Sequence, residues 1–142
     1  DKCGKEKVRF VHIGRKDRIP TTLKDLIIKA EEDTKKFTDF NIVLAIDYGG
    51  HDELLRAIDK TIKSKKAVTG ENIEKNLDTA EIPQIDYIIR TGGEKRLSGF
   101  MSWQCAYAEL FFTDTYFPAF TPKKFEDAIK EFSRRVRRFG GN

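Results

Sequence analysis

Stretches typical of β-strands alternate with stretches typical of α-helices along this chain, and this alternation is the feature that most limits its fold. Three strand-like runs are rich in β-branched or other apolar residues, and each is soon followed by glycine: Lys7–Ile13, Asn41–Ile46 and Ile85–Ile89. The second run is continuously apolar after its first residue, which is typical of a strand covered on both faces. A fourth, shorter strand is predicted at Glu109–Phe112.

Amphipathic helical patterns separate these strands. Apolar residues recur at three- and four-residue spacing after residue 20 and again after residue 52, which predicts two helices. Thr21 or Thr22 is a candidate N-cap for the first of them. A shorter helix is expected from Thr69 to Leu77.

The last predicted helix is the clearest element. Thr121 is a candidate N-cap, and an apolar stripe continues from Phe125 to Phe139 before Gly140 ends it. Strands that alternate with helices imply an α/β fold, with a mostly parallel sheet flanked by helices and ligands beyond the carboxyl ends of the strands. No linker or repeat interrupts the chain, so residues 1–142 are expected to form a single domain.

Composition argues against several classes of protein. Hydrophobic residues make up 39% of the chain and aromatic residues 11%, which is enough to build a core. No apolar run approaches the roughly 18 residues of a membrane-spanning helix, and no signal-peptide pattern begins the chain, so a cytoplasmic protein is expected. Cys3 and Cys105 lie in no metal-ligand spacing and are expected to be free thiols. His12 lies inside an apolar strand and is expected to be a core histidine with its hydrogen bonds satisfied.

The densest chemical signal is the segment from Arg90 to Ser98, which follows the third predicted strand. Two guanidinium groups, at Arg90 and Arg96, a hydroxyl at Ser98 and two glycines would offer a diphosphate bidentate donors, a neutral donor and close access to the backbone. On residue types alone a solvated loop is the better interpretation, because most arginines in loops are solvated.

The longer segment from Arg90 to Phe112 (RTGGEKRLSGFMSWQCAYAELFF) resembles the signature block of the cis-prenyltransferases, a family that includes undecaprenyl diphosphate synthases. Residues 41–53 resemble that family's Tyr-Gly-Gly region, and residues 137–141 resemble its Arg-x-Gly ending. The resemblance therefore covers essentially the whole chain. It implies a cis-prenyltransferase-like α/β fold that is incomplete at its N-terminus.

The resemblance implies cis-prenyl chain elongation, in which isopentenyl diphosphate attacks an ionised allylic diphosphate and a proton is lost, giving a polyprenyl diphosphate. It also implies Mg²⁺ as cofactor, a homodimer, and peripheral contact with membranes through the lipid product. It assigns Arg90, Arg96, Ser98, Arg138 and Gly140 to binding of isopentenyl diphosphate, Glu94 to catalysis and Glu109 to Mg²⁺. We expect Arg90 and Arg96 to grip the diphosphate beside a cation held by Glu109.

One part of the family pattern has no counterpart here. The family's His-x-x-Asp-Gly-Asn-Gly-Arg-Trp block supplies a second acid and holds the allylic diphosphate. His12–Arg15 is too short to match it and lacks the aspartate, and His51–Glu53 belongs to the Tyr-Gly-Gly region. The chain is therefore expected to carry the site of one substrate only and to be inactive when isolated.

Two other functions stay open. An accessory subunit could donate its Arg-x-Gly end to a catalytic partner, although such subunits usually lose the diphosphate-binding arginines that this chain keeps. The arginine-rich stretch at residues 134–138 suggests an anion- or nucleic-acid-binding module, but 27 basic residues are interleaved with 23 acidic ones, so binding of nucleic acid is not expected. Phe100, Trp103 and Tyr107 are expected to pack in the core or in a dimer interface.

Overall fold

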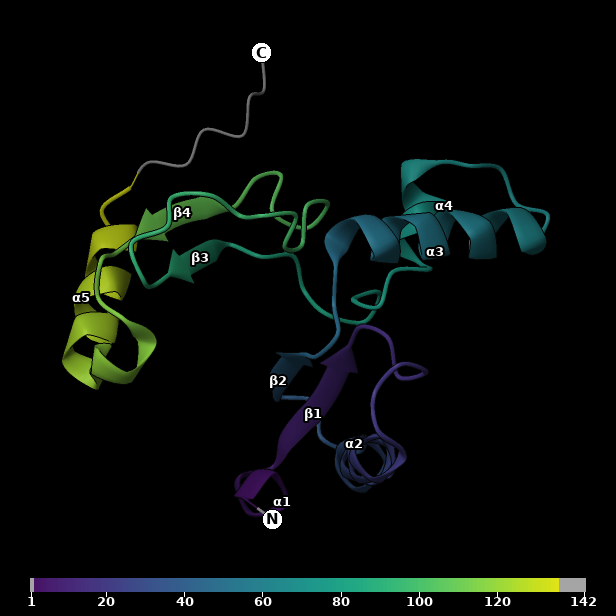
Figure 1. The fold of residues 1–142 in the computed structure, drawn as a ribbon, viewed down its shortest axis with the longest axis horizontal. Coiled ribbons are helices and arrows are strands. Elements are labelled where there is room, and N and C mark those ends of the chain that lie inside the picture. Colours follow the sequence, from purple (N-terminus) through teal and green to yellow (C-terminus); the bar gives the residue numbers. More distant parts are fainter. Residues whose placement is uncertain (1, 136–142) are drawn as a thin grey trace. The chain divides into compact units, whose positions relative to one another are not determined.

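The computed structural model describes residues 2–135, apart from the side chains at positions 2 and 4. Helices and parallel strands alternate along these residues and form two compact units, residues 1–83 and 84–142 (Figure 1). Each unit contains one two-stranded parallel sheet. The predicted α/β class is therefore confirmed, although the described strands form two pairs and not one sheet. That all 142 residues form a single domain remains a prediction.

The first unit contains two strands and four helices, which are α1 (Lys2–Glu6), β1 (Val8–Ile13), α2 (Thr21–Thr34), β2 (Phe40–Ala45), α3 (Gly50–Lys63) and α4 (Gly70–Glu74). β1 pairs with β2 in register from Val8–Phe40 to Ile13–Ala45. The predicted cap of α2 is wrong, because Pro20 is the N-cap and Thr21 is already helical. Thr69 is the N-cap of α4, since its Oγ1 atom accepts a hydrogen bond from the Asn72 N–H at 3.3 Å.

α2 covers the outer edge of β1. The Phe10 N–H donates to Thr34 Oγ1 and the His12 N–H donates to Glu31 Oε1, each at 3.0 Å. The backbone groups of alternate residues point to the same edge of a strand. The Ile13 carbonyl oxygen accepts a hydrogen bond from the Ile46 N–H, so Ile13 faces β2 and its neighbour His12 faces the opposite edge, as Phe10 does. The N–H groups that bind α2 are therefore those that face away from β2.

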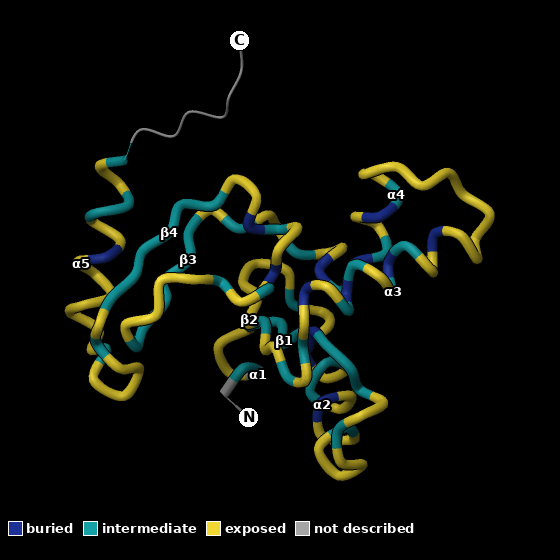
Figure 2. The backbone as a smooth tube through the Cα atoms, turned by 45° about the horizontal axis from the view of Figure 1, so that its top comes forward, coloured by how far each residue is buried: buried dark blue, intermediate teal, exposed yellow. Residues whose placement is uncertain are grey.

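β2 is open on the other side of the pair. Among residues 2–135 it pairs with β1 only, and five of its six residues are exposed (Figure 2). The expectation that this strand is covered on both faces is therefore wrong for the described structure. The physical reason is that, among the described elements, only β1 makes extensive contact with β2, so no helix covers the apolar side chains of this strand.

The buried residues of this unit include His12 and a cluster beside α3 and α4. Ala57, Ile73 and Leu77 form a buried cluster where α3 and α4 meet. The His12 side chain is buried as predicted, with Nε2 3.1 Å from Ile46 O. Its Nδ1 atom has no hydrogen-bond partner, so the expectation of a fully satisfied histidine is only half met.

Gly14 makes the turn that follows β1. Its φ is +116°, and a Cβ atom at this position would lie 2.3 Å from Ile46 O and 2.8 Å from Asp47 O. Only glycine accepts both the backbone angle and this close approach of another backbone segment.

Substitution of this glycine is expected to destabilise the first unit. Gly14→Ala should lower the free energy of unfolding by about 2 kcal/mol, because the added methyl group meets fixed carbonyl oxygens and the residue is held at positive φ. Urea denaturation followed by circular dichroism measures this change. Gly49→Ala is the matched control, because Gly49 has a φ of −144° and nothing lies within 4 Å of the Cβ position. Equal losses in the two variants would contradict the argument.

The described residues of the second unit form two strands and two helical segments, which are β3 (Tyr87–Arg90), β4 (Glu109–Phe112), the 3₁₀ helix η1 (Phe117–Ala119) and α5 (Pro122–Phe132). Tyr87 pairs with Glu109 and Arg90 with Phe112 in the parallel register. α5 packs on one face of this pair, because the Tyr87 ring stacks on Phe132 with centroids 4.6 Å apart. Thr121 caps α5 as predicted. The predicted continuation of this helix beyond Phe132 is wrong for residues 133–135, because Ser133 is the C-cap and these residues are not helical. The remainder of the predicted helix, residues 136–139, lies outside the described residues.

No helix within residues 2–135 combines the length and the apolar character that crossing a membrane requires.

Candidate functional site: the loop after strand β3

The loop after β3 begins with two glycines at positive φ. Gly92 has a φ of +91° and Gly93 a φ of +81°. The Gly92 N–H donates to Thr115 O at 2.9 Å and the Gly93 N–H donates to Thr113 O at 3.0 Å. These two N–H groups therefore hold the loop against the segment after β4 and are not free to bind a ligand. The expectation that these two glycines give a ligand close access to backbone N–H groups is therefore wrong.

Three of the predicted site residues are in direct contact within this loop. The Arg90 guanidinium donates to the carbonyl oxygen of Arg96, and the Arg96 guanidinium pairs with the Glu94 carboxylate. The Arg96 side chain is 67% exposed, so its positive charge is open to an anion from solvent. Ser98 lies two residues further along the same loop, at a φ of +50°. The structure therefore brings together Arg90, Glu94 and Arg96, and Ser98 lies near them in sequence.

An apolar cavity adjoins Arg90. Its volume is about 340 Å³, and it is lined by Ile88, Ile89, Arg90, Thr91, Leu97 and Phe100. This size lies at the lower end of the range found for small-molecule sites, roughly 300–1,000 Å³. A guanidinium group beside apolar walls suits a ligand that has an anionic head and a short hydrocarbon tail.

Glu109 lies away from this loop. It is the first residue of β4 and pairs with Tyr87, three residues before Arg90, which corresponds to about 10 Å along the strands. Because side chains alternate between the faces of a sheet, Glu109 and Arg90 also point to opposite faces of the β3–β4 pair. The expectation that Glu109 lies beside Arg90 and Arg96 is therefore wrong within this unit.

The Glu109 carboxylate forms an ion pair with Arg135. The Arg135 Nη1 atom donates to Glu109 Oε2 at 2.7 Å and to Leu110 O at 3.0 Å, and its Nη2 atom pairs with Glu131 at 2.8 Å. A resident Mg²⁺ site typically needs one or two carboxylates with room for water or phosphate oxygens. Among residues 2–135 no three histidine, cysteine or acidic side chains gather where they could hold a metal ion.

Tyr87 lies next to this ion-pair cluster, and its stability effect depends on pH. Burial of the ring, together with the hydrogen bond from its hydroxyl to Glu131 at 3.1 Å, raises the pKa of Tyr87 from 10.0 to about 12. A group whose pKa is raised by folding contributes stability below its unfolded pKa, and that contribution is lost as pH rises. We therefore expect the second unit to lose stability between about pH 10 and pH 12.

Thermal unfolding measured at several alkaline pH values checks this expectation. Tyr87→Phe should show a shallower fall in melting temperature over this interval than the parent chain. Tyr116→Phe is the control, since Tyr116 is 73% exposed at the start of η1. If Tyr87→Phe and the parent chain lose stability in parallel, the assignment to Tyr87 is wrong.

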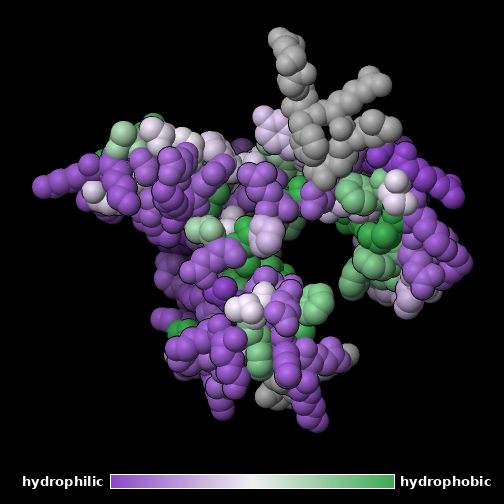
Figure 3. Space-filling view, turned by 180° about the vertical axis from the view of Figure 1, so that it is seen from behind, coloured by the Kyte–Doolittle hydropathy of each residue, from purple (hydrophilic) through white to green (hydrophobic). Residues whose placement is uncertain are grey.

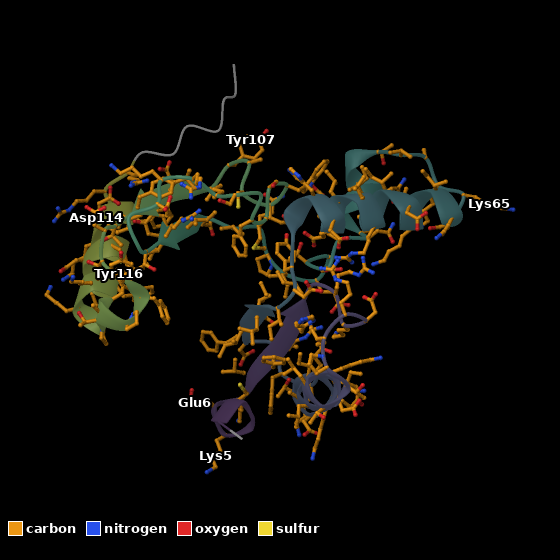
Figure 4. The ribbon with its side chains drawn as sticks, in the orientation of Figure 1. Lys5, Glu6, Lys65, Tyr107, Asp114 and Tyr116 are labelled. Carbon is orange, nitrogen blue, oxygen red and sulfur yellow. The ribbon has the colours of Figure 1, made fainter. Side chains whose placement is uncertain are left out.

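Two predicted site residues and three predicted packing residues remain to be placed. Arg138 and Gly140 lie outside the described residues. Tyr107 is 68% exposed and points away from the ribbon (Figure 4), and Phe100 and Trp103 are also exposed. These aromatic residues therefore do not belong to the core of the second unit, and their predicted place in a dimer interface remains open.

An ionic cluster that was not predicted from the sequence lies in the first unit, at the turn after β1. Arg56 forms two hydrogen bonds with Asp78, at 2.8 and 2.7 Å, and a third with Asp52 at 2.8 Å. Asp78 also accepts the Gly14 N–H at 3.0 Å, and Arg15 reaches Asp52 at 3.2 Å. Only the Asp52–Arg56 pair has a signal in the sequence, since the two residues are four positions apart on one helix.

Comparison with known proteins agrees with the signature in the loop. The family model described as "Putative undecaprenyl diphosphate synthase" matches residues 1–140. Isoprenyl transferases of Treponema denticola and Aquifex pyrophilus are 46% and 44% identical over 134 and 141 residues. These matches cover 94% and 99% of this chain but 59% and 61% of those proteins.

Two solved structures are similar in fold. The crystal structure of a "probable undecaprenyl diphosphate synthase" from Campylobacter jejuni has a TM-score of 0.87 and 40% identity, and the match covers 96% of this chain and 65% of that one. Lavandulyl diphosphate synthase from Lavandula x intermedia, solved in complex with dimethylallyl diphosphate, has a TM-score of 0.85 and 31% identity. This match covers 94% of this chain and 61% of that one.

The parallel α/β fold and the arginine loop, together with these matches, place the chain in a family of prenyltransferases. It belongs to the undecaprenyl diphosphate synthase family. It spans about three-fifths of the length of the curated relatives that it matches.

Proposed function

We propose that this chain carries the site for isopentenyl diphosphate of an enzyme that lengthens cis-prenyl chains. The observation that carries the proposal is the loop in which Arg90 contacts Arg96 beside an apolar cavity. Two guanidinium groups suit a diphosphate, because each can donate two parallel hydrogen bonds to phosphate oxygens. The apolar walls suit the five-carbon tail of isopentenyl diphosphate.

The roles of the individual residues follow from their chemistry. Arg90 and Arg96 would bind the diphosphate and fix the position of the double bond that attacks the allylic partner. Ser98 would add a neutral donor. Glu94, which pairs with Arg96, would hold that guanidinium in place when no substrate is bound. Arg138 and Gly140 are proposed to complete the site from the end of the chain.

Glu109 is proposed to contribute a single carboxylate to an Mg²⁺ ion that also binds substrate phosphate. Within one copy of the chain it points to the other face of the β3–β4 pair and is held by Arg135. A site that uses both Glu109 and the arginine loop would therefore draw on two copies, which agrees with the proposed homodimer. The exposed Trp103 and Tyr107 side chains are candidates for its interface.

Binding and turnover can be tested separately. Isothermal titration of isopentenyl diphosphate into the 142-residue chain should show binding at one site. Elongation of an allylic primer with labelled isopentenyl diphosphate should require, in addition, a polypeptide that corresponds to the part of the relatives this chain does not match. Absence of binding would refute the proposed site. Binding without elongation in the completed mixture would favour a non-catalytic accessory subunit.

A further inference from the structure

Three backbone hydrogen bonds hold the base of the arginine loop to residues 113–115, the segment that follows β4. These bonds, of 3.0, 3.0 and 2.9 Å, run from Thr113 N–H to Arg90 O, from Gly93 N–H to Thr113 O and from Gly92 N–H to Thr115 O. Two glycines give a loop little stiffness of their own, because glycine adopts positive and negative φ with similar ease. The position of residues 113–115 therefore sets the path of the chain between Arg90 and Arg96.

The segment 113–115 is shaped by one of its own hydroxyl groups. Thr113 Oγ1 accepts a hydrogen bond from the Thr115 N–H at 3.3 Å, and both residues are half-buried. A threonine hydroxyl that bonds the backbone two residues further on closes a local turn. Thr113 therefore supports the loop in two ways. Its backbone binds the loop directly, and its hydroxyl fixes Thr115, which in turn binds Gly92.

A lysine of α5 also reaches this segment. Lys124 Nζ donates to Thr115 Oγ1 at 2.8 Å, and the Lys124 N–H is bound by the capping residue Thr121 at 3.4 Å. Lys124 is exposed, and hydrophilic side chains cover much of the visible face of the chain (Figure 3). A hydrogen bond that is open to water contributes little, because water can replace either partner. The hydroxyl of Thr113 is therefore the stronger of the two supports.

The two guanidinium groups of the loop lie on opposite sides of the glycine pair. Arg90 is the last residue of β3, whereas Arg96 follows the glycines. A head group with two phosphates can engage both guanidinium groups at once, but a head group with one phosphate needs only one of them. The separation of Arg90 and Arg96 should therefore affect the binding of a diphosphate more than that of a monophosphate.

We propose that Thr113 is a positioning residue, whose hydroxyl sets the spacing of Arg90 and Arg96 and so makes the loop selective for a diphosphate over a monophosphate. It acts through Thr115 and the glycine pair. A displacement of about 1 Å at a binding group is enough to lose much of its effect, so a support of this kind has a measurable consequence. The inference rests on the proposed function, because it requires isopentenyl diphosphate to bind at this loop.

The test is a calorimetric titration of the 142-residue chain with isopentenyl diphosphate and, separately, with isopentenyl monophosphate. Thr113→Val keeps the branched shape of the side chain but removes the hydroxyl. It should weaken binding of the diphosphate by about tenfold and binding of the monophosphate by less than about threefold. Thr113→Ser keeps the hydroxyl and should restore the parent selectivity. Without ligand, hydrogen exchange at the Gly92 and Gly93 amides should be faster in Thr113→Val than in the parent chain.

Ser133→Ala is the matched control. The Ser133 hydroxyl also binds the backbone in the second unit, since it donates to Lys130 O at 2.8 Å, but it lies at the C-terminal end of α5. Both affinities of this variant should stay within about twofold of the parent values, because the hydroxyl is exposed and far along the helix from the segment 113–115.

Circular dichroism of each free variant checks its folding. Thr115→Val, which removes the acceptor of Lys124, decides the matter if Thr113→Val does not fold. It should lower the selectivity for the diphosphate by about threefold, since the bond that it removes is the weaker support.

Three outcomes would overturn the inference. They are equal losses of affinity for the two ligands in Thr113→Val, a failure of Thr113→Ser to restore selectivity, and unchanged selectivity in a Thr113→Val chain whose glycine amides exchange faster. If the parent chain does not bind isopentenyl diphosphate, the proposed function is wrong and the inference falls with it. Binding by the parent chain with unchanged selectivity in the variants would contradict the inference alone.

Discussion

Replacing Arg90 by alanine is expected to weaken the binding of isopentenyl diphosphate by about 10- to 100-fold, because hydrogen bonds to a charged group contribute roughly 1.5–3 kcal/mol. Arg90 lies at the end of β3, at the rim of the apolar cavity, and its guanidinium also supports the loop through the carbonyl oxygen of Arg96. Arg90→Lys should restore little of the affinity, since an ammonium group cannot form the bidentate contact. Isothermal titration with isopentenyl diphosphate measures both variants.

Lys130→Ala is the control for this prediction. It removes the same positive charge from the same unit, but Lys130 lies in the last turn of α5 and not in the loop. Its affinity for isopentenyl diphosphate should stay within about twofold of the parent value, because an exposed charge at that distance is largely screened. If Arg90→Ala and Lys130→Ala lose affinity equally, the effect is one of overall charge and the proposed site is wrong.

The second large effect is expected at Asp78. Asp78→Ala should lower the free energy of unfolding of the first unit by about 3 kcal/mol, because it leaves the Arg56 guanidinium partly buried without its bidentate partner. It also removes the acceptor of the Gly14 N–H, which positions the turn after β1. Urea denaturation of the chain, followed by hydrogen exchange at β1 and α3, measures the loss and locates it.

The Asp78–Arg56 pair also makes the free energy of unfolding depend on pH in the acidic range. Burial by itself would raise the pKa of Asp78, but hydrogen bonds from Arg56 and from the Gly14 N–H outweigh burial and hold this pKa below its ordinary value of 3.8. A carboxyl whose pKa is lowered by folding contributes stability above its unfolded pKa and loses it as pH falls. The stability difference between the parent chain and Asp78→Ala should therefore narrow below about pH 4.

An exposed ion pair on the same helix is the control. Lys63 and Asp59 are 2.7 Å apart on the surface of α3, and both side chains are more than half exposed. Lys63→Met should change the free energy of unfolding by less than about 0.5 kcal/mol, as is usual for exposed pairs. A loss as large as that of Asp78→Ala would mean that burial does not set the strength of these pairs.

The secondary structure could be predicted from the sequence largely because its local signals are strong. The apolar runs before Gly14 and Gly49 gave β1 and β2 to within a residue, and Thr121 marked the start of α5. α4 ends at Glu74, earlier than predicted, because Leu77 joins the buried cluster from the turn that follows the helix. The spacing of apolar residues in the sequence is the same for that turn as for a helix that continues to Leu77.

The site could be predicted only in part. Arg90 ends β3 and Glu94 and Arg96 lie in the loop that follows it, so proximity in sequence is enough to bring these three together. Glu109 was placed with them incorrectly, because its position depends on strand register and on which face of the sheet it occupies. Its pairing with Arg135, 26 residues away, has no local signal. The pairing of Asp78 with Arg56 is equally long-range and was missed for the same reason.

The hydrogen bonds from β1 to Thr34 and Glu31 also bear on how copies of this chain could aggregate. Fibril growth by edge-to-edge pairing needs two free edges in every molecule, one to receive a neighbour and one to offer to the next. Here one of the two is closed by a helix of the same unit. Misassembly through this sheet would therefore stop at a pair of molecules, unless α2 first unfolds and releases the edge it protects.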